Sequence, residues 1–294
     1  FQGGHLADRW VRAGHDITIL NTYSSQAERN ISAVAGDVRT VWGSVTDKEI
    51  VDKTVRGHDV VVHLAALINV DDSLEGPRSF VDVNVGGTVN VLEAARRESC
   101  RVIYASSCEV YGHSEKSPVA EDAEIRPHSP YAASKAGADR LCFAYNKSYG
   151  LDLTIMRPCN VYGTHQKSGR GGAVIPIFAG LAAEGKPLRV FGDGSQQREY
   201  INVLDLVSAY DLVLRRNDLT GAVLNVGTGE TPSINDIATF ISEKTGATIS
   251  HEPSRPGEVR GFSLNSSRIK ELGFAPEIAF WEGVETYLDA NGST

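Results

Sequence analysis

The segment DVVVHLAA (residues 59–66) is a short and almost continuous run of apolar residues. A strand without a polar face must be buried on both sides, as in a parallel sheet that is covered by helices. Similar runs are HDITILN (15–21), RTVWGSV (39–45), CRVIYASS (100–107), LDLTIMRPCN (151–160) and AVLNVG (222–227). The sequence therefore predicts a sheet of buried parallel strands.

Helical patterns separate these runs. Apolar residues recur with the period of a helix in the segments 5–14, 48–57, 78–98, 129–149 and 204–216. Strands that alternate with helices are typical of a doubly wound α/β fold, which binds its ligands at the carboxyl ends of the strands. We therefore predict a Rossmann-type parallel sheet.

Two segments interrupt the alternation: a loop-rich stretch at 164–199 and the proline-rich region after residue 228. We assign 1–163 and 200–227 to a nucleotide-binding domain. We assign 164–199 and 228–294 to a smaller carboxyl-terminal lobe that binds the substrate.

The chain begins with FQGGHLADRW (1–10), in which two glycines lead directly into a helical pattern. Glycines, a helix and a following strand form the second half of a βαβ nucleotide-binding unit. Because such a unit starts with an inner strand, we expect a first strand to be missing from the chain as given.

Composition narrows the classes of partner. The 294 residues are 41% hydrophobic and 22% charged, as in an ordinary globular protein. No apolar run approaches the roughly 20 residues that cross a bilayer, so we predict no membrane partner. The net charge of -8 disfavours nucleic acid and anionic membranes, because both are usually bound by a basic face.

Cysteine and histidine patterns argue against a metal. The four cysteines contain no C-x-x-C pair, and the eight histidines contain no H-x-H or H-E-x-x-H pattern. Thiols without a visible secretory segment predict a reducing cytoplasm. Cys100, Cys142 and Cys159 are interpreted as packing residues, and His63 as a hydrogen-bonded core residue.

The segment SPYAASKAGADRL (129–141) places Tyr131 and Lys135 one helical turn apart on one face. A phenol needs roughly 4 kcal/mol of stabilisation of its anion to lower its pKa from about 10 to about 7. An ammonium about 4 Å away supplies about that much at an effective dielectric of about 20. With Ser107 at the end of a preceding strand, the pair predicts a site that removes the proton of a substrate hydroxyl.

Eight motifs carry a resemblance to a known family. They are GGHLADR, VVHLAA, VNVGGTVNVLEAAR, SSCEVYG, SPYAASK, RPCNVYG, FGDGSQQREYINVLD and LNVGTG. In this order, along the length of the chain, they resemble the extended short-chain dehydrogenase/reductase family of nucleotide-sugar epimerases and dehydratases. The resemblance implies an NAD-dependent enzyme, a nucleotide diphosphate sugar as substrate, and a homodimer built on helices 78–98 and 129–149.

The resemblance also implies roles for individual residues. Tyr131 would be the base, Ser107 would bind the sugar hydroxyl, and Lys135 would lower the pKa of Tyr131 and hold the nicotinamide ribose. The implied cofactor-binding residues are Phe1, Gln2, Gly3, Asn21, Ser44, Val45, Leu64, Ala65, Ala66, Asn84, Tyr131, Lys135 and Pro158. The implied substrate-binding residues are Ser107, Asn160, Arg198 and Arg255. Asn160 could instead join a strand end to a turn, and the two arginines could be solvated.

The cofactor site departs from the family pattern at two places. Asn21 replaces the acidic residue that normally binds the adenosine ribose, and Ser44 and Val45 stand where an adenine-side aspartate is often found. An amide can bind a 2′-hydroxyl but does not repel a 2′-phosphate. NAD is expected, and NADP stays open.

The triplet Ser107-Cys108-Glu109 decides which reaction is predicted. In family members that resemble 4,6-dehydratases the triplet is Thr-Asp-Glu, with the glutamate as base and the aspartate as acid. Glu109 matches the base, and Cys108 is a possible acid because an ordinary thiol is mostly protonated at pH 7. In a continuing strand, however, Cys108 would face away from its two neighbours and would only fill space.

We therefore predict a nucleotide-sugar dehydratase that catalyses 4,6- or 5,6-dehydration through a 4-keto intermediate. The alternatives are a nucleotide-sugar 4-epimerase, a UDP-glucuronate decarboxylase, and a non-catalytic dinucleotide sensor. A 4-epimerase needs no acid or base beyond the oxidation step, whereas a dehydratase does.

Overall fold

The predicted apolar runs form parallel strands in the computed structural model, which describes residues 1–114, 116–166, 173–254, 261 and 263–292. The chain divides into two units. The first contains Phe1–Gly112, Glu124–Arg157 and Val207–Leu224, and the second contains His113–Ala123, Pro158–Leu206 and Asn225–Thr294.

The strands of the α/β fold lie in two sheets. Strands β1 (Thr18–Asn21) and β2 (Arg39–Trp42) form a parallel pair. A four-stranded sheet has the order β3-β4-β5-β9 and is built from Val60–His63, Arg101–Ala105, Leu153–Pro158 and Val223–Val226. The parallel α/β class is confirmed, although the two sheets do not pair with each other within the described residues.

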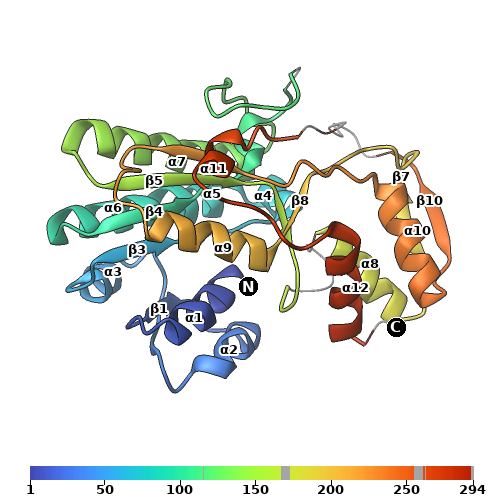
Figure 1. The fold of residues 1–294 in the computed structure, drawn as a ribbon, viewed down its shortest axis with the longest axis horizontal. Helices are drawn as coiled ribbons and strands as arrows, with labels where there is room; N and C mark the ends of the chain where they lie inside the picture. The colour runs from blue at the N-terminus through green and yellow to red at the C-terminus, as the bar shows by residue number, and fades with distance from the viewer. Residues whose placement is uncertain (115, 167–172, 255–260, 262, 293–294) are drawn as a thin grey trace. The chain divides into compact units, whose positions relative to one another are not determined.

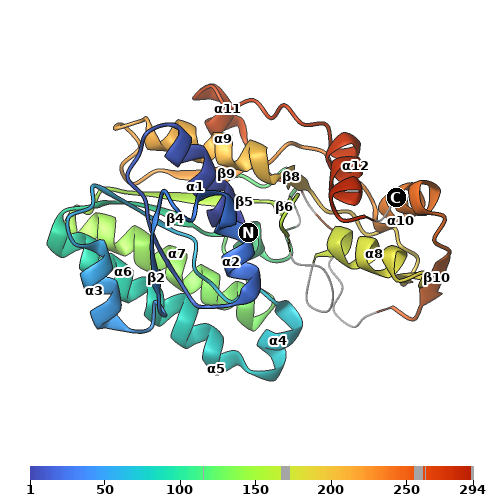
Figure 2. The same ribbon diagram turned by 90° about the horizontal axis from the view of Figure 1, so that it is seen from below.

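Helices cover both faces of the four-stranded sheet. In Figure 2, α3 (Lys48–Val55), α6 (Gly87–Glu98) and α7 (Pro130–Tyr149) lie on one face, whereas α1 (Gln2–Arg12) and α9 (Val203–Leu214) lie on the other. The core contains fully buried residues of α6, β4, β5 and α7, among them Leu92, Val102, Leu153, Ala138 and Cys142. The remaining helices of this unit are α2 (Ser25–Ile31), α4 (Val70–Glu75) and α5 (Pro77–Phe80).

The sequence around α7 explains its ends. Ser129 precedes the helix, and its side chain accepts a hydrogen bond from the backbone N–H of Ala132. Pro130 takes the first helical position, where no backbone N–H is needed. Gly150 ends the helix in the left-handed conformation, with φ of 66°.

The helix predicted at 78–98 is helical throughout, but its type changes. The π-helix η2 (Val81–Gly86) lies between α5 and α6. It places Asn84 in the interior, where the amide bonds to the backbone of Leu67 and to the side chain of Ser134. Hydropathy periodicity did not reveal this change because the apolar spacing stays helix-like through it.

The second unit has its own core and two small sheets. Strand β6 (Asn160–Tyr162) pairs with β8 (Tyr200–Asn202), and β7 (Leu188–Phe191) pairs with β10 (Ile249–Glu252), both in parallel. Its helices are α8 (Val174–Ala183), α10 (Ile234–Thr245), α11 (Ser267–Glu271) and α12 (Phe280–Ala290) (Figure 1). Residues 158–163 and 200–206, which contain the paired strands β6 and β8, lie in this unit.

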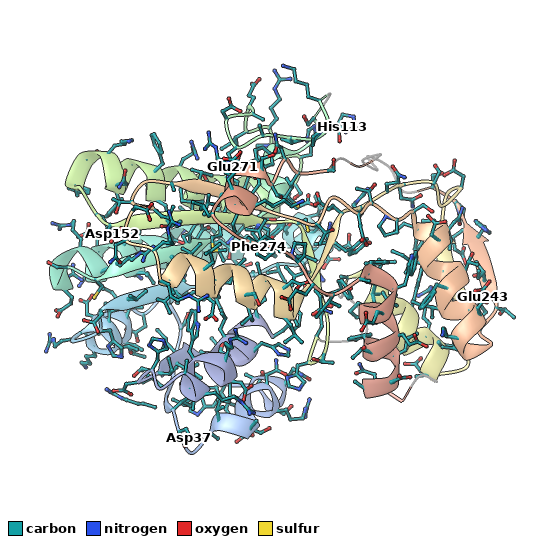
Figure 3. All side chains as sticks on the ribbon, viewed as in Figure 1. Asp37, His113, Asp152, Glu243, Glu271 and Phe274 are labelled. Atoms are coloured by element: carbon teal, nitrogen blue, oxygen red, sulfur yellow. The ribbon has the colours of Figure 1, made fainter. Side chains whose placement is uncertain are left out.

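The ends of the elements are joined by polar side chains. Asp152, labelled in Figure 3, directly precedes β5 and accepts a hydrogen bond of 2.6 Å from the Thr220 hydroxyl.

Among the described residues, no helix is long and apolar enough to cross a membrane. In the same part of the chain, no three His, Cys, Asp or Glu side chains are grouped as metal ligands.

Candidate active site

The triplet lies in a tight turn that follows β4. The strand ends at Ala105, and Cys108–Tyr111 form the 3-10 helix η3, capped by Ser107. The Ser107 hydroxyl accepts a hydrogen bond of 3.2 Å from the backbone N–H of Glu109. The chain leaves the strand before Ser107, so the alternation of a continuing strand does not apply to Cys108.

The other two residues of the triplet, Cys108 and Glu109, lie near Tyr131. The charges of Glu109 and, to a smaller extent, Cys108 raise the pKa of the Tyr131 phenol. Cys108 is buried and Glu109 is half-buried. The turn thus brings a hydroxyl, a thiol and a carboxylate toward one phenol.

Tyr131 stands in the first turn of α7. Its phenol forms a hydrogen bond with the Ser107 side chain, and its ring packs edge-on against Phe80 at 6.4 Å. Burial raises the pKa of Tyr131 well above its usual value, although the hydrogen bond to Ser107 opposes this shift. The phenol is therefore neutral at pH 7 in this structure.

Lys135 lies one turn further along α7 and is buried. Its Nζ donates a hydrogen bond of 2.5 Å to the carbonyl of Ala105 and lies 4.6 Å from the centre of the Tyr104 ring. Burial lowers the pKa of Lys135 to about 8, against the opposing effects of Cys142 and Asp139. Most of the Lys135 side chains are still charged at pH 7.

The expected lowering of the Tyr131 pKa by Lys135 does not occur in this structure. The pKa of Tyr131 is raised, and the ammonium donates to the Ala105 carbonyl. The physical reason is that burial destabilises the phenolate by more free energy than its hydrogen bond to Ser107 restores.

The predicted cofactor residues lie after strands or at the start of helix α1. Phe1, Gln2 and Gly3 form the start of α1, which has no acidic residue in its first turn and no side-chain cap. A Cβ atom at Gly3 would lie 3.5 Å from Leu64, which follows β3 together with Ala65 and Ala66. A small residue and an uncapped helix start suit the diphosphate of a dinucleotide.

The residues predicted for the adenosine side lie at the end of β1 and after β2. Asn21 is the exposed last residue of β1 and pairs in register with Trp42 of β2. The Ser44 hydroxyl is bonded to Thr46 at 2.8 Å, and the Val45 carbonyl accepts a hydrogen bond from Asn90. Because none of the predicted contacts is a carboxylate, these residues would accept a ribose 2′-hydroxyl but would not repel a 2′-phosphate.

The side-chain amide of Asn84 bonds to the backbone of Leu67 and to the side chain of Ser134. Its amide donates to the Leu67 carbonyl at 2.9 Å and to the Ser134 hydroxyl at 2.8 Å, and its oxygen accepts from the Leu67 N–H at 2.8 Å. Both donor hydrogens are therefore used within the protein. The amide holds the loop after β3 against α7, the helix of Tyr131.

Of the predicted substrate residues, Ser107 lies in the first unit, and Asn160 and Arg198 lie in the second. The backbone and side-chain nitrogens of Asn160 both donate to the Glu199 carbonyl, at 3.1 and 2.9 Å, so Asn160 joins β6 to the start of β8. Arg198 is half-buried and donates to the Gln197 carbonyl. Arg255 lies outside the described residues, and Pro158 is the last residue of β5.

Sequence reasoning missed two charged residues next to the site. Asp139 of α7 and Arg157 of β5 form an ion pair with side-chain exposures of 0% and 1%. The signals were Arg157, the only charge in the buried strand segment LTIMRP, and Asp139, a carboxylate four residues after Lys135 on α7. His63, in contrast, is a core histidine as expected, bonded to the Thr88 hydroxyl at 2.9 Å.

Comparison with known proteins agrees with this geometry. Residues 1–227 match the NAD dependent epimerase/dehydratase family. The chain is 36% identical to a dTDP-glucose 4,6-dehydratase of Streptomyces niveus, over 97% of the chain and 90% of the relative. It is 33% identical to a putative UDP-glucose 4-epimerase of Methanocaldococcus jannaschii, over 98% and 94%.

A solved structure is similar throughout. The dTDP-glucose 4,6-dehydratase DesIV of Streptomyces venezuelae, crystallised with NAD, matches with a TM-score of 0.92 and 29% identity, over 99% of this chain and 93% of that one. The motifs, the Ser107–Tyr131 contact and these similarities agree. The chain belongs to the NAD-dependent epimerase/dehydratase family of nucleotide-sugar enzymes.

Proposed function

We propose that this enzyme is a dehydratase of a nucleotide diphosphate hexose, which removes water by 4,6- or 5,6-dehydration through a 4-keto intermediate. The observation that carries the proposal is the position of Glu109, close enough to Tyr131 for its charge to raise the phenol pKa. A dehydratase needs a second base at this place, whereas a 4-epimerase needs only the oxidation machinery.

The oxidation step uses the residues of β4 and α7. Ser107 holds the C4 hydroxyl of the sugar, and Tyr131 removes its proton. NAD, when bound, supplies a positive charge, accepts the hydride from C4 and later returns it. This positive charge would stabilise the phenolate, whose formation burial disfavours, and the charged Lys135 would hold the nicotinamide ribose.

The elimination step uses the rest of the triplet. Glu109 takes the proton from C5, and Cys108 gives a proton to the C6 hydroxyl, which leaves as water. For 4,6-dehydration the hydride would be returned at C6, and Glu109 would return a proton to C5. Tyr131 then passes the proton of the C4 hydroxyl to the Cys108 thiolate, directly or through solvent, so that both side chains regain their starting states.

The substrate and the setting are part of the proposal. Arg198 and Arg255 suit the phosphates of a nucleotide diphosphate, because a guanidinium binds phosphate through paired hydrogen bonds. The dehydratase and epimerase names of the relatives favour a nucleotide sugar. None of the four cysteines forms a disulfide, in keeping with a reducing cytoplasm.

We also propose a homodimer that forms through α6 and α7. Their exposed apolar side chains include Phe143, and an open groove beside them is lined by Thr46, Val81, Asp82, Val85, Gly86, Val89 and Asn90. Apolar and small side chains on adjacent helices favour packing against a second copy.

Incubation with dTDP-glucose, UDP-glucose or UDP-N-acetylglucosamine in deuterated water tests the reaction. We expect a product that has lost one water and, for 4,6-dehydration, carries one solvent deuterium at C5. Glu109→Gln should slow the loss of water about 10²- to 10⁴-fold but leave the initial reduction of NAD measurable. Tyr131→Phe is the matched control, because it should abolish both steps.

The alternatives give different products. Inversion at C4 without a change in mass would show an epimerase and would contradict the proposal. Release of carbon dioxide from UDP-glucuronate would show a decarboxylase. Unchanged dehydration by Glu109→Gln would remove Glu109 from the mechanism.

A further inference from the structure

Asp139 and Arg157 form a buried ion pair that the mechanism above does not use. The Arg157 guanidinium donates to both carboxylate oxygens of Asp139, at 2.9 and 3.0 Å. A buried ion pair usually adds little net stability, because desolvation offsets the attraction. The other contacts of the pair therefore indicate what it does.

Those contacts lead to both ends of the catalytic turn. Asp139 accepts a hydrogen bond of 2.7 Å from the hydroxyl of Ser106, the residue before Ser107. Arg157 donates a hydrogen bond of 2.8 Å to the hydroxyl of Tyr111, and its guanidinium lies 4.9 Å from the centre of that ring. The segment 106–111, which carries the triplet, is thus held at its first and last residues.

The same pair is attached to the helix that carries the base. Tyr131, Lys135 and Asp139 are spaced by four residues and share one face of α7. Asp139 therefore links the turn after β4 to the helix of Tyr131, while Arg157 links both to β5. Ser106, Tyr111 and the pair itself are all buried, so water does not weaken these bonds.

Asp139 also acts on the charge of Lys135. Burial lowers the pKa of Lys135, and Cys142 and the carboxylate of Asp139 on α7 raise it. Arg140 on the same helix donates a hydrogen bond of 3.0 Å to that carboxylate. From the neighbouring strands, the ring of Tyr104 on β4 lies against the ammonium, and His63 on β3 is influenced by its charge. Asp139 is thus the buried carboxylate that favours the charged lysine.

We propose that Asp139 and Arg157 are positioning residues, which hold the Ser107–Glu109 turn at the correct distance from Tyr131 and Lys135. The proposal rests on the catalytic roles given above to Ser107, Tyr131 and Lys135. It holds equally for a dehydratase and an epimerase, because both begin with the same oxidation.

Substitutions of the pair should separate positioning from binding. A displacement of about 1 Å at a catalytic group can cost about 100-fold in rate, so we expect Asp139→Asn and Arg157→Lys to lower kcat by about that factor. The KM for the nucleotide sugar and the Kd for NAD, measured by calorimetry, should stay within about twofold, since neither residue touches a ligand in the proposal.

The pH profile gives a second readout. Asp139→Asn should move the alkaline limb of the kcat profile to lower pH, because Lys135 then loses its proton more easily. Arg157→Lys keeps the charge and should not move the limb, although it loses the forked hydrogen bonds. The titration of Lys135, followed by NMR of 13C-labelled lysine, should show the same difference and needs no substrate.

A buried carboxylate elsewhere in the chain serves as the control, and two hydroxyls that bond to the ion pair offer milder substitutions. Asp205→Asn removes a buried carboxylate of the second unit, which accepts from the backbone of Glu277 and Ile278, and should leave kcat and the alkaline limb unchanged. If the substitutions of the ion pair prevent folding, Ser106→Ala and Tyr111→Phe remove one hydroxyl each and should lower kcat several-fold.

Two results would overturn the proposal. One is a wild-type kcat and pH profile in folded Asp139→Asn, and the other is wild-type kcat in both hydroxyl variants. Absence of turnover by the wild type on every nucleotide sugar would instead contradict the proposed function, and the Lys135 titration would still decide the effect of Asp139.

Discussion

His63 and Lys135 are ionisable side chains that lie next to each other in the interior of the first unit. Burial lowers the pKa of Lys135 to about 8, and burial followed by the nearby Lys135 charge lowers the pKa of His63 to about 3. Lys135 is therefore charged and His63 neutral at pH 7. The arrangement keeps a cation for catalysis and avoids a second cation beside it.

The state of His63 predicts how stability depends on pH. Between about pH 6.5 and about pH 3 the unfolded chain binds a proton at His63 that the folded protein does not. The free energy of unfolding should therefore fall as the pH is lowered through this range, by roughly 1.4 kcal/mol per pH unit from this residue. Urea unfolding of His63→Gln should lack this part of the slope.

The matched control for this measurement is His251→Gln, which changes an exposed histidine of the second unit. Its slope should equal that of the wild type. Parallel curves for His63→Gln and the wild type would show that His63 does not couple folding to pH.

At the scale of elements, helix α6 lies unusually close to the loop after β2. A Cβ atom at Gly87, in the first turn of α6, would lie 2.5 Å from the Cγ2 atom of Val45. Asn90 on the next turn donates to the Val45 carbonyl at 2.9 Å. The absence of a side chain at Gly87 thus allows α6 to support a loop that is predicted to face the cofactor.

We expect Gly87→Ala to be destabilising although alanine favours helices. The gain in helix propensity is about 0.5–1 kcal/mol, whereas overpacking against a stiff valine costs about 1–3 kcal/mol. Chemical denaturation should show a net loss of stability, and adding Val45→Ala should recover most of it. Gly36→Ala is the control, because a Cβ atom at Gly36 would have no neighbour within 4 Å.

At the scale of the whole molecule, the proposed dimer surface on α6 and α7 can be tested by adding a charge. Phe143 of α7 is 39% exposed, and the cations of Arg140 and Lys147 lie near its ring. Burying a carboxylate at a subunit contact, even one paired with these cations, requires desolvation of the charges and commonly costs about 2 kcal/mol or more, which raises the dimer Kd over tenfold. Sedimentation should therefore show Phe143→Asp as a monomer at concentrations where the wild type is a dimer.

Ile249→Asp on β10 is the control, since Ile249 is 37% exposed and lies in the second unit. It should remain a dimer. A monomeric wild type, or a dimeric Phe143→Asp, would contradict the proposed interface.

Much of the site could be predicted because its signals are local. The one-turn spacing of Tyr131 and Lys135 and the serine at the end of a strand are visible in short segments of sequence. The turn around Cys108 could not be predicted, because a strand and a 3-10 helix continue equally well from CRVIYASS. The role of Asn84 was hidden for a similar reason, since only the π-helix shows that its amide bonds within the protein.

The sequence by itself determined the alternation of strands and helices, the family motifs and the choice of candidate catalytic side chains, since each depends on local spacing and residue type. The tertiary structure alone decided the pKa values of Tyr131 and Lys135 and the pairing of Asp139 with Arg157. Burial and contacts between distant segments cause these effects, and neither burial depth nor a contact partner is written in the neighbouring residues.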